Sequence, residues 1–207
     1  MRLVKLFLIF IIFFSFSLKS KDIRLTENSN QFSITSKSFS EFTFINHLSE
    51  ITSMRVKKDT DEFVKLLVRG YGENAKNGDA ELPVLEELLS VPFGAEVNIK
   101  ILNKEEMIIS LSDYGINDFI FPSQPSLSKS DNADDVLFYF NEDYYNYSGF
   151  YANELVTTEL LGKMRGQQLA RLSLSPFSYN PTTNELKIVT KLEVKILFKN
   201  IDVEGHK

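Results

Sequence analysis

The amino-acid sequence predicts an all-β fold, either an antiparallel two-layer sandwich or a curved sheet, with at most short helical turns. Near the C-terminal end apolar and polar residues alternate over a long run, and the same alternation recurs at Val97, Ile99 and Ile101. A period of two residues is typical of a strand with one buried and one wet face. Several such strands need a facing layer, which favours two antiparallel layers.

A processed leader is predicted over residues 1–20. Arg2 and Lys5 precede an apolar block from Leu6 to Phe16, and polar residues follow at once. The block holds 11 residues, whereas a membrane-spanning helix needs about 20. We therefore expect an exported protein of the periplasm, cell surface or medium, with no stable membrane insertion after the leader is removed. An uncleaved anchor is the alternative.

The mature chain is expected to begin around Lys21 with a short lead-in. Residues 21–40 are rich in Ser, Asn and Thr, so we expect them to be loosely ordered, and we place the β domain at residues 41–207. Its first strand is predicted from Glu41, where Phe42 and Phe44 have polar or small neighbours.

The middle of the domain alternates between strand and turn patterns. The apolar stretch Glu62–Val68 predicts a strand, and the Gly- and Asn-containing stretch Arg69–Leu82 predicts a loop. Val91–Ala95 contains the Pro-Phe-Gly sequence of a turn before the strand around Ile99. Prolines and serines in Phe121–Asp135 predict an exposed loop, and loops of that length often contact partners.

The C-terminal third predicts a strand followed by a hairpin. Ala170, Leu172 and Leu174 alternate with polar residues, and Asn180–Asn184 has the composition of a turn. The apolar positions of the return strand are Leu186, Ile188, Leu192, Val194, Ile196 and Phe198. Their burial contributes on the order of 10 kcal/mol before the entropy cost is counted, so this strand should be central to the fold.

The composition argues against catalysis by this chain and against nucleic-acid binding. A net charge of −5 provides no basic surface for a polyanion. The chain has no cysteine, which excludes a cysteine nucleophile, a thiolate zinc site and a disulfide within it. Of the two histidines, His206 lies at the end of the chain, and the sequence around His47 does not resemble a nucleophile elbow.

No cofactor or metal site is predicted. Gly70-Tyr71-Gly72 lacks the later glycine or Gly-Lys-Ser/Thr of phosphate-binding loops. The acidic residues Asp131, Asp134 and Asp135 suggest calcium, but Ala133 and Val136 occupy positions where an EF-hand needs an oxygen ligand and a glycine. Glu105 and Glu106 are adjacent, so in a strand they point to opposite faces and cannot act as a catalytic pair.

The densest aromatic stretch runs from Tyr139 to Tyr151. It has two interpretations. Buried rings would supply strand packing, since aromatic residues favour strands. Exposed tyrosines, Tyr144 and Tyr145 among them, could instead stack on sugars or on a partner protein.

Three short motifs, in this order and spacing, resemble the gingipain-type propeptide, the N-terminal prodomain of clostripain- and gingipain-related cysteine peptidases exported by Bacteroidetes. They are Gly78–Val84 leading to Val91–Ala95, then Gly162–Gln167, then Ser175–Pro181 with Asn184–Leu186. The motifs extend over most of the mature chain. One departure is Ala80, where the family usually has proline. The resemblance leaves open whether the sequence is a precursor fragment, a truncated product or a free-standing prodomain.

The resemblance implies a prodomain that inhibits a cysteine peptidase catalytic domain, in cis or in trans, keeps the zymogen latent and assists its folding. A Lys or Arg of such a pro-region can occupy the specificity pocket of a basic-specific peptidase. Lys129 is the candidate, because it lies in the predicted exposed loop between Ser123 and Asp135. The remaining family-motif residues are expected to be structural: Pro83, Pro92, Gly94, Arg165, Gly166, Pro176, Tyr179, Asn180 and Pro181. The alternative function is a stand-alone secreted β module that binds carbohydrate or protein through the aromatic stretch.

Overall fold

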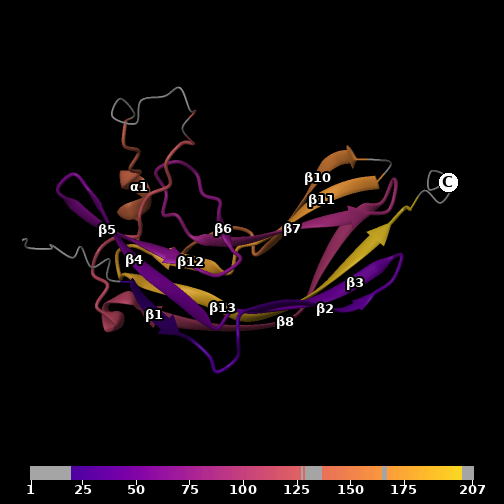
Figure 1. Ribbon diagram of the computed structural model, residues 1–207, viewed down its shortest axis with the longest axis horizontal. Helices are drawn as coiled ribbons and strands as arrows, with labels where there is room; N and C mark the ends of the chain where they lie inside the picture. The colour runs from indigo at the N-terminus through magenta and orange to yellow at the C-terminus, as the bar shows by residue number, and fades with distance from the viewer. Residues whose placement is uncertain (1–19, 127, 129–136, 165–166, 202–207) are drawn as a thin grey trace, which may run out of the picture.

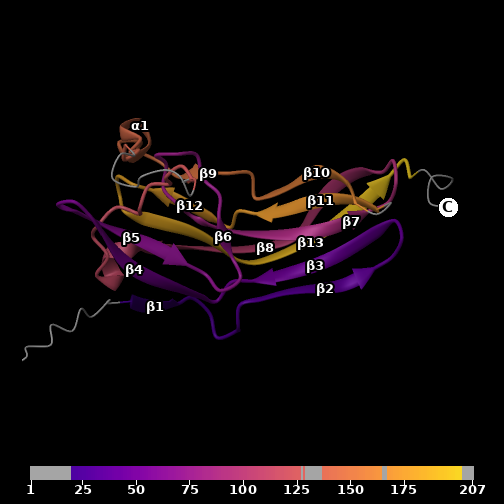
Figure 2. The same cartoon turned by 45° about the horizontal axis from the view of Figure 1, so that its top comes forward.

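The computed structural model describes residues 20–126, 128, 137–164 and 167–201. It is an elongated molecule in which two long strands, β8 (Glu96–Ser110) and β13 (Glu185–Lys199), run through most of the length (Figures 1 and 2). The described residues include no helix that is long and apolar enough to cross a membrane.

Three antiparallel sheets make up the described part of the chain. The first contains β1 (Ser20–Arg24), β4 (Glu50–Lys58) and β5 (Asp61–Leu67). The second has the order β10 (Val156–Met164), β11 (Gln167–Leu174), β7 (Pro83–Val91) and β6 (Gly72–Glu73). The third contains β2 (Gln31–Lys37), β3 (Glu41–His47), β13, β12 (Phe177–Asn180) and β9 (Tyr151–Ala152), with β8 on the other side of β13. Two short helical segments, the 3-10 turn η1 (Leu111–Tyr114) and α1 (Glu142–Tyr145), complete the fold.

The strand β13 is the centre of the third sheet. Strand β8 pairs with one edge of β13 from Glu185 to Lys199. Strands β12 and β3 pair with successive parts of the other edge. The first part of β13 pairs with β12 and the second part, from Lys191 to Leu197, pairs with β3. One strand therefore connects both ends of the molecule, as the hydrophobic alternation of its sequence predicts.

Two hydrophobic cores form on opposite faces of β13. Leu186 and Ile188 belong to the first core, beside Tyr179 and the sheet of β1, β4 and β5. The next residue, Val189, belongs to the second core, beside β3, β7 and β11. Neighbouring side chains of a strand point to opposite faces, so the two cores lie on different sides.

A β-bulge keeps the rest of β13 in the second core. The register shifts between Val189 and Lys191, which leaves Thr190 as an extra residue. In a regular strand, even-numbered residues face one side of the sheet and odd-numbered residues face the other. An extra residue exchanges the two sides for all the residues that follow it. Leu192, Val194 and Ile196 therefore share the face of Val189, although they have the parity of Ile188.

The predicted all-β class, the C-terminal hairpin and the strands at Glu41, Glu62 and Val97 are confirmed. The loosely ordered lead-in over 21–40 is wrong, because this region contains β1 and β2. Ile23 of β1 is fully buried in the first core, and the Asn30 side chain accepts the Glu50 amide at 3.0 Å. A few long-range contacts thus order a segment of polar composition.

The strand interpretation of the aromatic stretch is also wrong over most of its length. Asn141 caps a single helical turn, α1, by accepting a hydrogen bond from the Tyr144 amide at 3.3 Å. Tyr144 and Tyr145 are nevertheless buried in the first core. The buried-ring interpretation therefore holds for Tyr144 and Tyr145, whereas Tyr139, Phe140, Tyr147 and Tyr151 are exposed.

Candidate functional site

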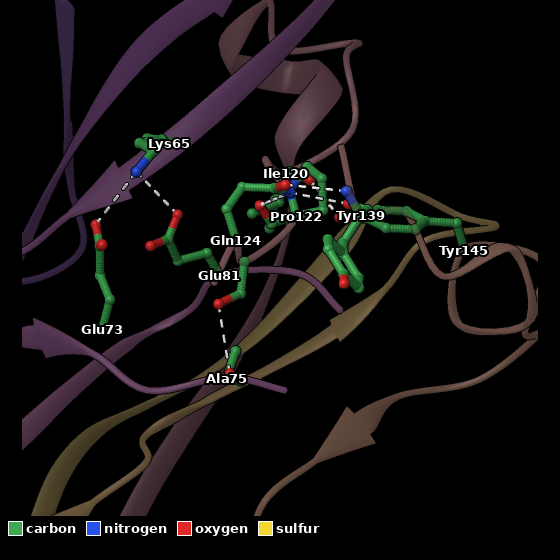
Figure 3. A network of polar contacts seen from close by, with 10 residues as sticks. Lys65, Glu73, Ala75, Glu81, Ile120, Pro122, Gln124, Tyr139 and Tyr145 are labelled. Atoms are coloured by element: carbon green, nitrogen blue, oxygen red, sulfur yellow. Dashed lines mark hydrogen bonds and ion pairs between the residues drawn. The ribbon is translucent and has the colours of Figure 1, made fainter. Parts of the chain in front are cut away.

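The candidate site lies near α1, at the two described ends of a loop, which begins after Ser123 and ends at Tyr139 (Figure 1). Gln124 joins the two ends of this loop. Its Nε2 donates to the carbonyl oxygens of Pro122 at 2.9 Å and Tyr139 at 2.8 Å, and its Oε1 accepts the Tyr139 amide at 3.0 Å (Figure 3). A single side chain therefore fixes both ends of the loop.

The segment Gly78–Glu81 forms the support beneath the loop. Gly78 donates its amide to the Ser123 carbonyl, and Ser123 donates its amide to the Asp79 carbonyl, both at 2.8 Å. On the return side, Asn141 donates its amide to Gly78 O at 2.9 Å and its Nδ2 to Asp79 Oδ1 at 2.6 Å. We call this set of contacts, together with the Gln124 contacts, the loop base.

Glycine is required at position 78. Its φ is +90°, and a Cβ there would lie 3.0 Å from the Asn141 backbone nitrogen. Residues that have a Cβ rarely adopt such a positive φ. The first family motif thus supplies the residue that allows close contact between the support and the returning chain.

The loop base is attached to the first core through residues 119–121. Val64 of β5 donates to Phe119 O at 2.9 Å and accepts from the Phe121 amide at 2.8 Å. The buried Tyr145 hydroxyl donates to Ile120 O at 2.6 Å. Because Val64, Ile120 and Tyr145 are buried in the first core, the loop ends have fixed positions, which limits the entropy lost when the loop binds a partner.

An apolar cavity of about 560 Å³ opens beside the loop base. Phenylalanine rings form most of its wall, and Phe119 and Phe140 are 42% and 37% exposed. Its lining residues are Thr60, Asp61, Glu62, Phe63, Phe119, Phe138 and Phe140. Exposed aromatic side chains around a cavity are typical of protein contact surfaces.

Three charged side chains lie close together on one side of Gln124 (Figure 3). Lys65 Nζ is 2.9 Å from Glu81 Oε2 and 3.8 Å from Glu73 Oε1. Burial and the neighbouring Glu73 raise the pKa of Glu81 to about 7, although Lys65 acts in the opposite direction.

Three of the predicted site residues lie outside the described residues: Lys129, Arg165 and Gly166. The acidic residues Asp131, Asp134 and Asp135 also lie outside them. His47 ends β3, half-buried and far along the chain from the loop base. Among the residues that the structure describes, no group of three or more His, Asp or Glu side chains could hold a metal ion.

The other family-motif residues occupy turns and strand ends, and all of them except Gly94 are buried. Pro83 begins β7, and Pro92 and Gly94 form the turn before β8, where Gly94 has a φ of 71° and the Ala95 amide donates to Pro92 O at 3.1 Å. Pro176 accepts the Val189 amide at 2.9 Å. Pro92, Gly94 and Pro176 lie at turns next to strands of the second core, and Pro83 follows the loop-base segment by two residues.

The turn Asn180–Asn184 is fixed by side chains of the third motif. The hydroxyl of the fully buried Tyr179 donates to Asn184 Oδ1 at 3.2 Å, and Asn184 Nδ2 donates to Ile116 O at 2.8 Å. Asn180 Oδ1 accepts the Thr183 amide at 3.4 Å, and Pro181 is buried between them. Asn184 has a φ of 53°, a conformation that asparagine tolerates better than most residues.

Sequence reasoning missed Gln124 and Asn141 as organising residues. No local pattern distinguishes them, because their partners are 15 and 62 residues away in sequence. The Gly78–Val84 motif was the only available signal, and it pointed to the correct segment.

Comparisons with known proteins agree with this architecture. Lys-gingipain of Porphyromonas gingivalis is 30% identical over 184 residues, which are 89% of this chain and 11% of the relative. Gingipain R2 of the same species is 26% identical over 125 residues, covering 59% of this chain and 16% of the relative. The chain thus corresponds to about a tenth to a sixth of the length of these relatives.

Two solved structures share the fold. A structure of gingipain K from P. gingivalis, from a study of zymogenic latency, superposes with a TM-score of 0.83 at 30% identity and covers 87% of this chain and 99% of that chain. A complex of the pro- and mature domains of P. gingivalis RgpB gives a TM-score of 0.69 at 18% identity, with 83% and 86% covered. The Propeptide_C25 family model matches residues 22–207. This chain therefore belongs to the Propeptide_C25 family.

Proposed function

We propose that this domain is an exported prodomain that keeps a gingipain-like cysteine peptidase latent and assists its folding, with the catalytic domain as its partner in cis or in trans. The observation that carries the proposal is the similarity to the gingipain K structure from a study of zymogenic latency, which extends over 99% of that chain. The match of residues 22–207 to the Propeptide_C25 family model supports the same function.

The loop base gives this proposal a physical basis. Gln124 and Asn141 hold the ends of the loop on a buried framework. Fixed loop ends limit the conformational entropy that is lost when the segment between them binds a partner. The apolar cavity at Phe63 and Phe140 adjoins the same loop and extends the contact surface.

We propose Lys129 as the residue of the loop that enters the specificity pocket of the peptidase. It lies between the two fixed ends of the segment, and its ammonium group matches a pocket for basic side chains. Lys129→Ala is expected to weaken inhibition of a Lys-specific peptidase at least tenfold. Lys37→Ala is the matched control, because Lys37 is an exposed lysine of β2, a strand in the half of the molecule away from α1 (Figure 1).

Inhibition in trans tests the proposal directly. The purified processed chain, residues 21–207, is added to a gingipain-type catalytic domain, and initial rates are measured with a peptide substrate ending in Lys or Arg. We expect saturable inhibition at stoichiometric concentrations. A correctly folded domain that leaves the rate unchanged against Lys-specific and Arg-specific enzymes would refute it.

Folding assistance has a separate test. The unfolded catalytic domain is diluted from denaturant with and without the prodomain, and active enzyme is counted with a covalent active-site label after the prodomain is removed. A higher yield with the prodomain is expected, and equal yields would restrict the function to inhibition.

The alternative carbohydrate-binding function loses its main residues in the structure. Tyr144 and Tyr145 are 5% and 4% exposed, so their faces cannot stack on a sugar. Substitution of either residue by alanine would disturb the first core, and it would not report on a binding platform.

A further inference from the structure

Three charged side chains from separate segments converge beneath the loop base: Lys65 of β5, Glu73 of β6 and Glu81 (Figure 3). The Lys65 ammonium lies 2.9 Å from one carboxylate and 3.8 Å from the other, and 5.0 Å from the centre of the Phe121 ring. Two ionised carboxylates around one ammonium leave an excess negative charge. This arrangement is stable with a single shared negative charge and unfavourable with two.

The cluster is partly shielded from water. The side chains of Glu81, Lys65 and Glu73 are 11%, 24% and 38% exposed. Burial is the largest cause that raises the pKa of Glu81 to about 7, followed by the hydrogen bond with Glu73, and Lys65 opposes both. From α1 the Tyr145 hydroxyl also interacts with Glu81, but it remains protonated because burial raises its own pKa strongly.

Glu81 is part of the loop base through its backbone. Its amide donates to Phe121 O at 2.9 Å, and the preceding residue Ala80 forms a bridge with Pro122. Asp79 then contacts Ser123 and Asn141. The Glu81 side chain is therefore attached directly to the segment that holds both ends of the loop.

We propose that Lys65, Glu73 and Glu81 form a pH-sensitive latch, which holds the loop base closed when Glu81 is protonated and loosens it when both carboxylates are ionised. In the closed form the neutral Glu81 carboxyl donates its proton in a hydrogen bond to Glu73, and Lys65 balances the remaining charge. In the loosened form Glu81 has released that proton to solvent and repels Glu73. On the proposed function, latency is then tighter in mildly acidic than in alkaline medium.

The latch is tested without a peptidase by amide hydrogen exchange of the processed chain between pH 6 and 8.5. Exchange at the Glu81 and Phe121 amides is corrected for the intrinsic base-catalysed rate. We expect the protection factors to fall at least about tenfold as the pH rises, since one unit of pKa difference corresponds to tenfold in the opening equilibrium. Protection that does not change with pH overturns the proposal.

Glu81→Gln keeps the shape of the side chain but cannot ionise, so its protection should stay at the high level of the protonated form across this range. Glu106→Gln is the matched control. Glu106 also lies 2.8 Å from a lysine, Lys104, but on the exposed surface of β8, and this variant should retain the pH response of the wild type. A full pH response in Glu81→Gln would also overturn the latch.

Inhibition measurements then separate the latch from the proposed function. The ratio of the inhibition constants of wild type and Glu81→Gln is measured at each pH with the same enzyme, which cancels the pH dependence of the peptidase. The ratio should rise at least about threefold from pH 6 to 8.5. No inhibition by either protein contradicts the prodomain function while the exchange result stands, and a constant ratio with normal inhibition contradicts the coupling of the latch to latency.

Discussion

Ile188 and Val189 are consecutive residues of β13, yet their side chains belong to different hydrophobic cores on opposite faces of the strand. The bulge at Thr190 then keeps Val194 on the side of Val189. One strand thus contributes side chains to both cores, and we expect it to couple the stability of the two ends.

Ile188→Ala and Val194→Ala, one in each core, should each lower the free energy of unfolding, by about 2–4 kcal/mol for Ile188→Ala and somewhat less for Val194→Ala. Because β13 joins the cores, each variant should still unfold in one transition, measured by denaturant titration with far-UV and near-UV circular dichroism. Glu193→Ala, a half-exposed position on the same strand, should change stability by about 0.5 kcal/mol or less. Two separated transitions in wild type would contradict the coupling.

Gly78→Ala should loosen the loop base. The new Cβ would be 3.0 Å from the Asn141 nitrogen at a φ of +90°, which costs roughly 1–3 kcal/mol. The variant should lower the melting temperature and weaken inhibition. Gly72→Ala is the control, since nothing lies within 4 Å of a Cβ there, and an equal effect of both substitutions would argue against the contact with Asn141.

Gln124→Ala removes the side chain that joins the two ends of the loop. The core is untouched, so the melting temperature should change little. Limited proteolysis within the loop should become several-fold faster, because cleavage requires local opening. Gln31→Ala, on the exposed edge strand β2, should leave the cleavage rate unchanged.

Alkaline pH should unfold the domain through its buried tyrosines. Burial raises the pKa of Tyr71 to about 12, although its hydrogen bond with Asn46 acts in the opposite direction. Burial also raises the pKa values of Tyr144, Tyr145 and Tyr179 above the usual value. A raised folded-state pKa contributes stability that is intact below the unfolded value, near 10, and is lost as pH rises through the folded value.

Absorbance at 295 nm and circular dichroism, recorded together from pH 9 to 13, measure this effect. The ionisation of these four tyrosines should coincide with loss of structure. Ionisation of all eight tyrosines near pH 10 in a folded domain would show that the four rings are accessible to solvent.

Glu81 should also make the domain less stable as the pH rises, but in a lower pH range than the tyrosines. Its folded-state pKa of about 7 exceeds the ordinary value of 4.5, so its contribution is complete below 4.5 and is lost as the pH rises through 7. The melting temperature of wild type relative to Glu81→Gln should therefore fall from pH 5 to 8. A constant difference between the two proteins would mean that Glu81 is ionised throughout.

The local sequence determined those features that a pattern of a few neighbouring residues can predict. The alternation from Leu186 to Phe198 predicted β13, the Asn180–Asn184 composition predicted its hairpin, and three short motifs identified the family. These features depend on strand periodicity and turn chemistry, which short segments carry on their own. The absence of cysteine from the chain was also readable directly.

Tertiary structure decided the features that depend on distant partners. The order of β1 comes from burial of Ile23 under later strands, and the helical turn at Tyr144 comes from capping and packing. The reversal of faces at Thr190 depends on how β8 pairs with β13, which residue parity cannot reveal. The loop base needs Gln124 and Asn141 to meet residues 15 and 62 positions away, and only the folded chain brings those groups within hydrogen-bonding distance.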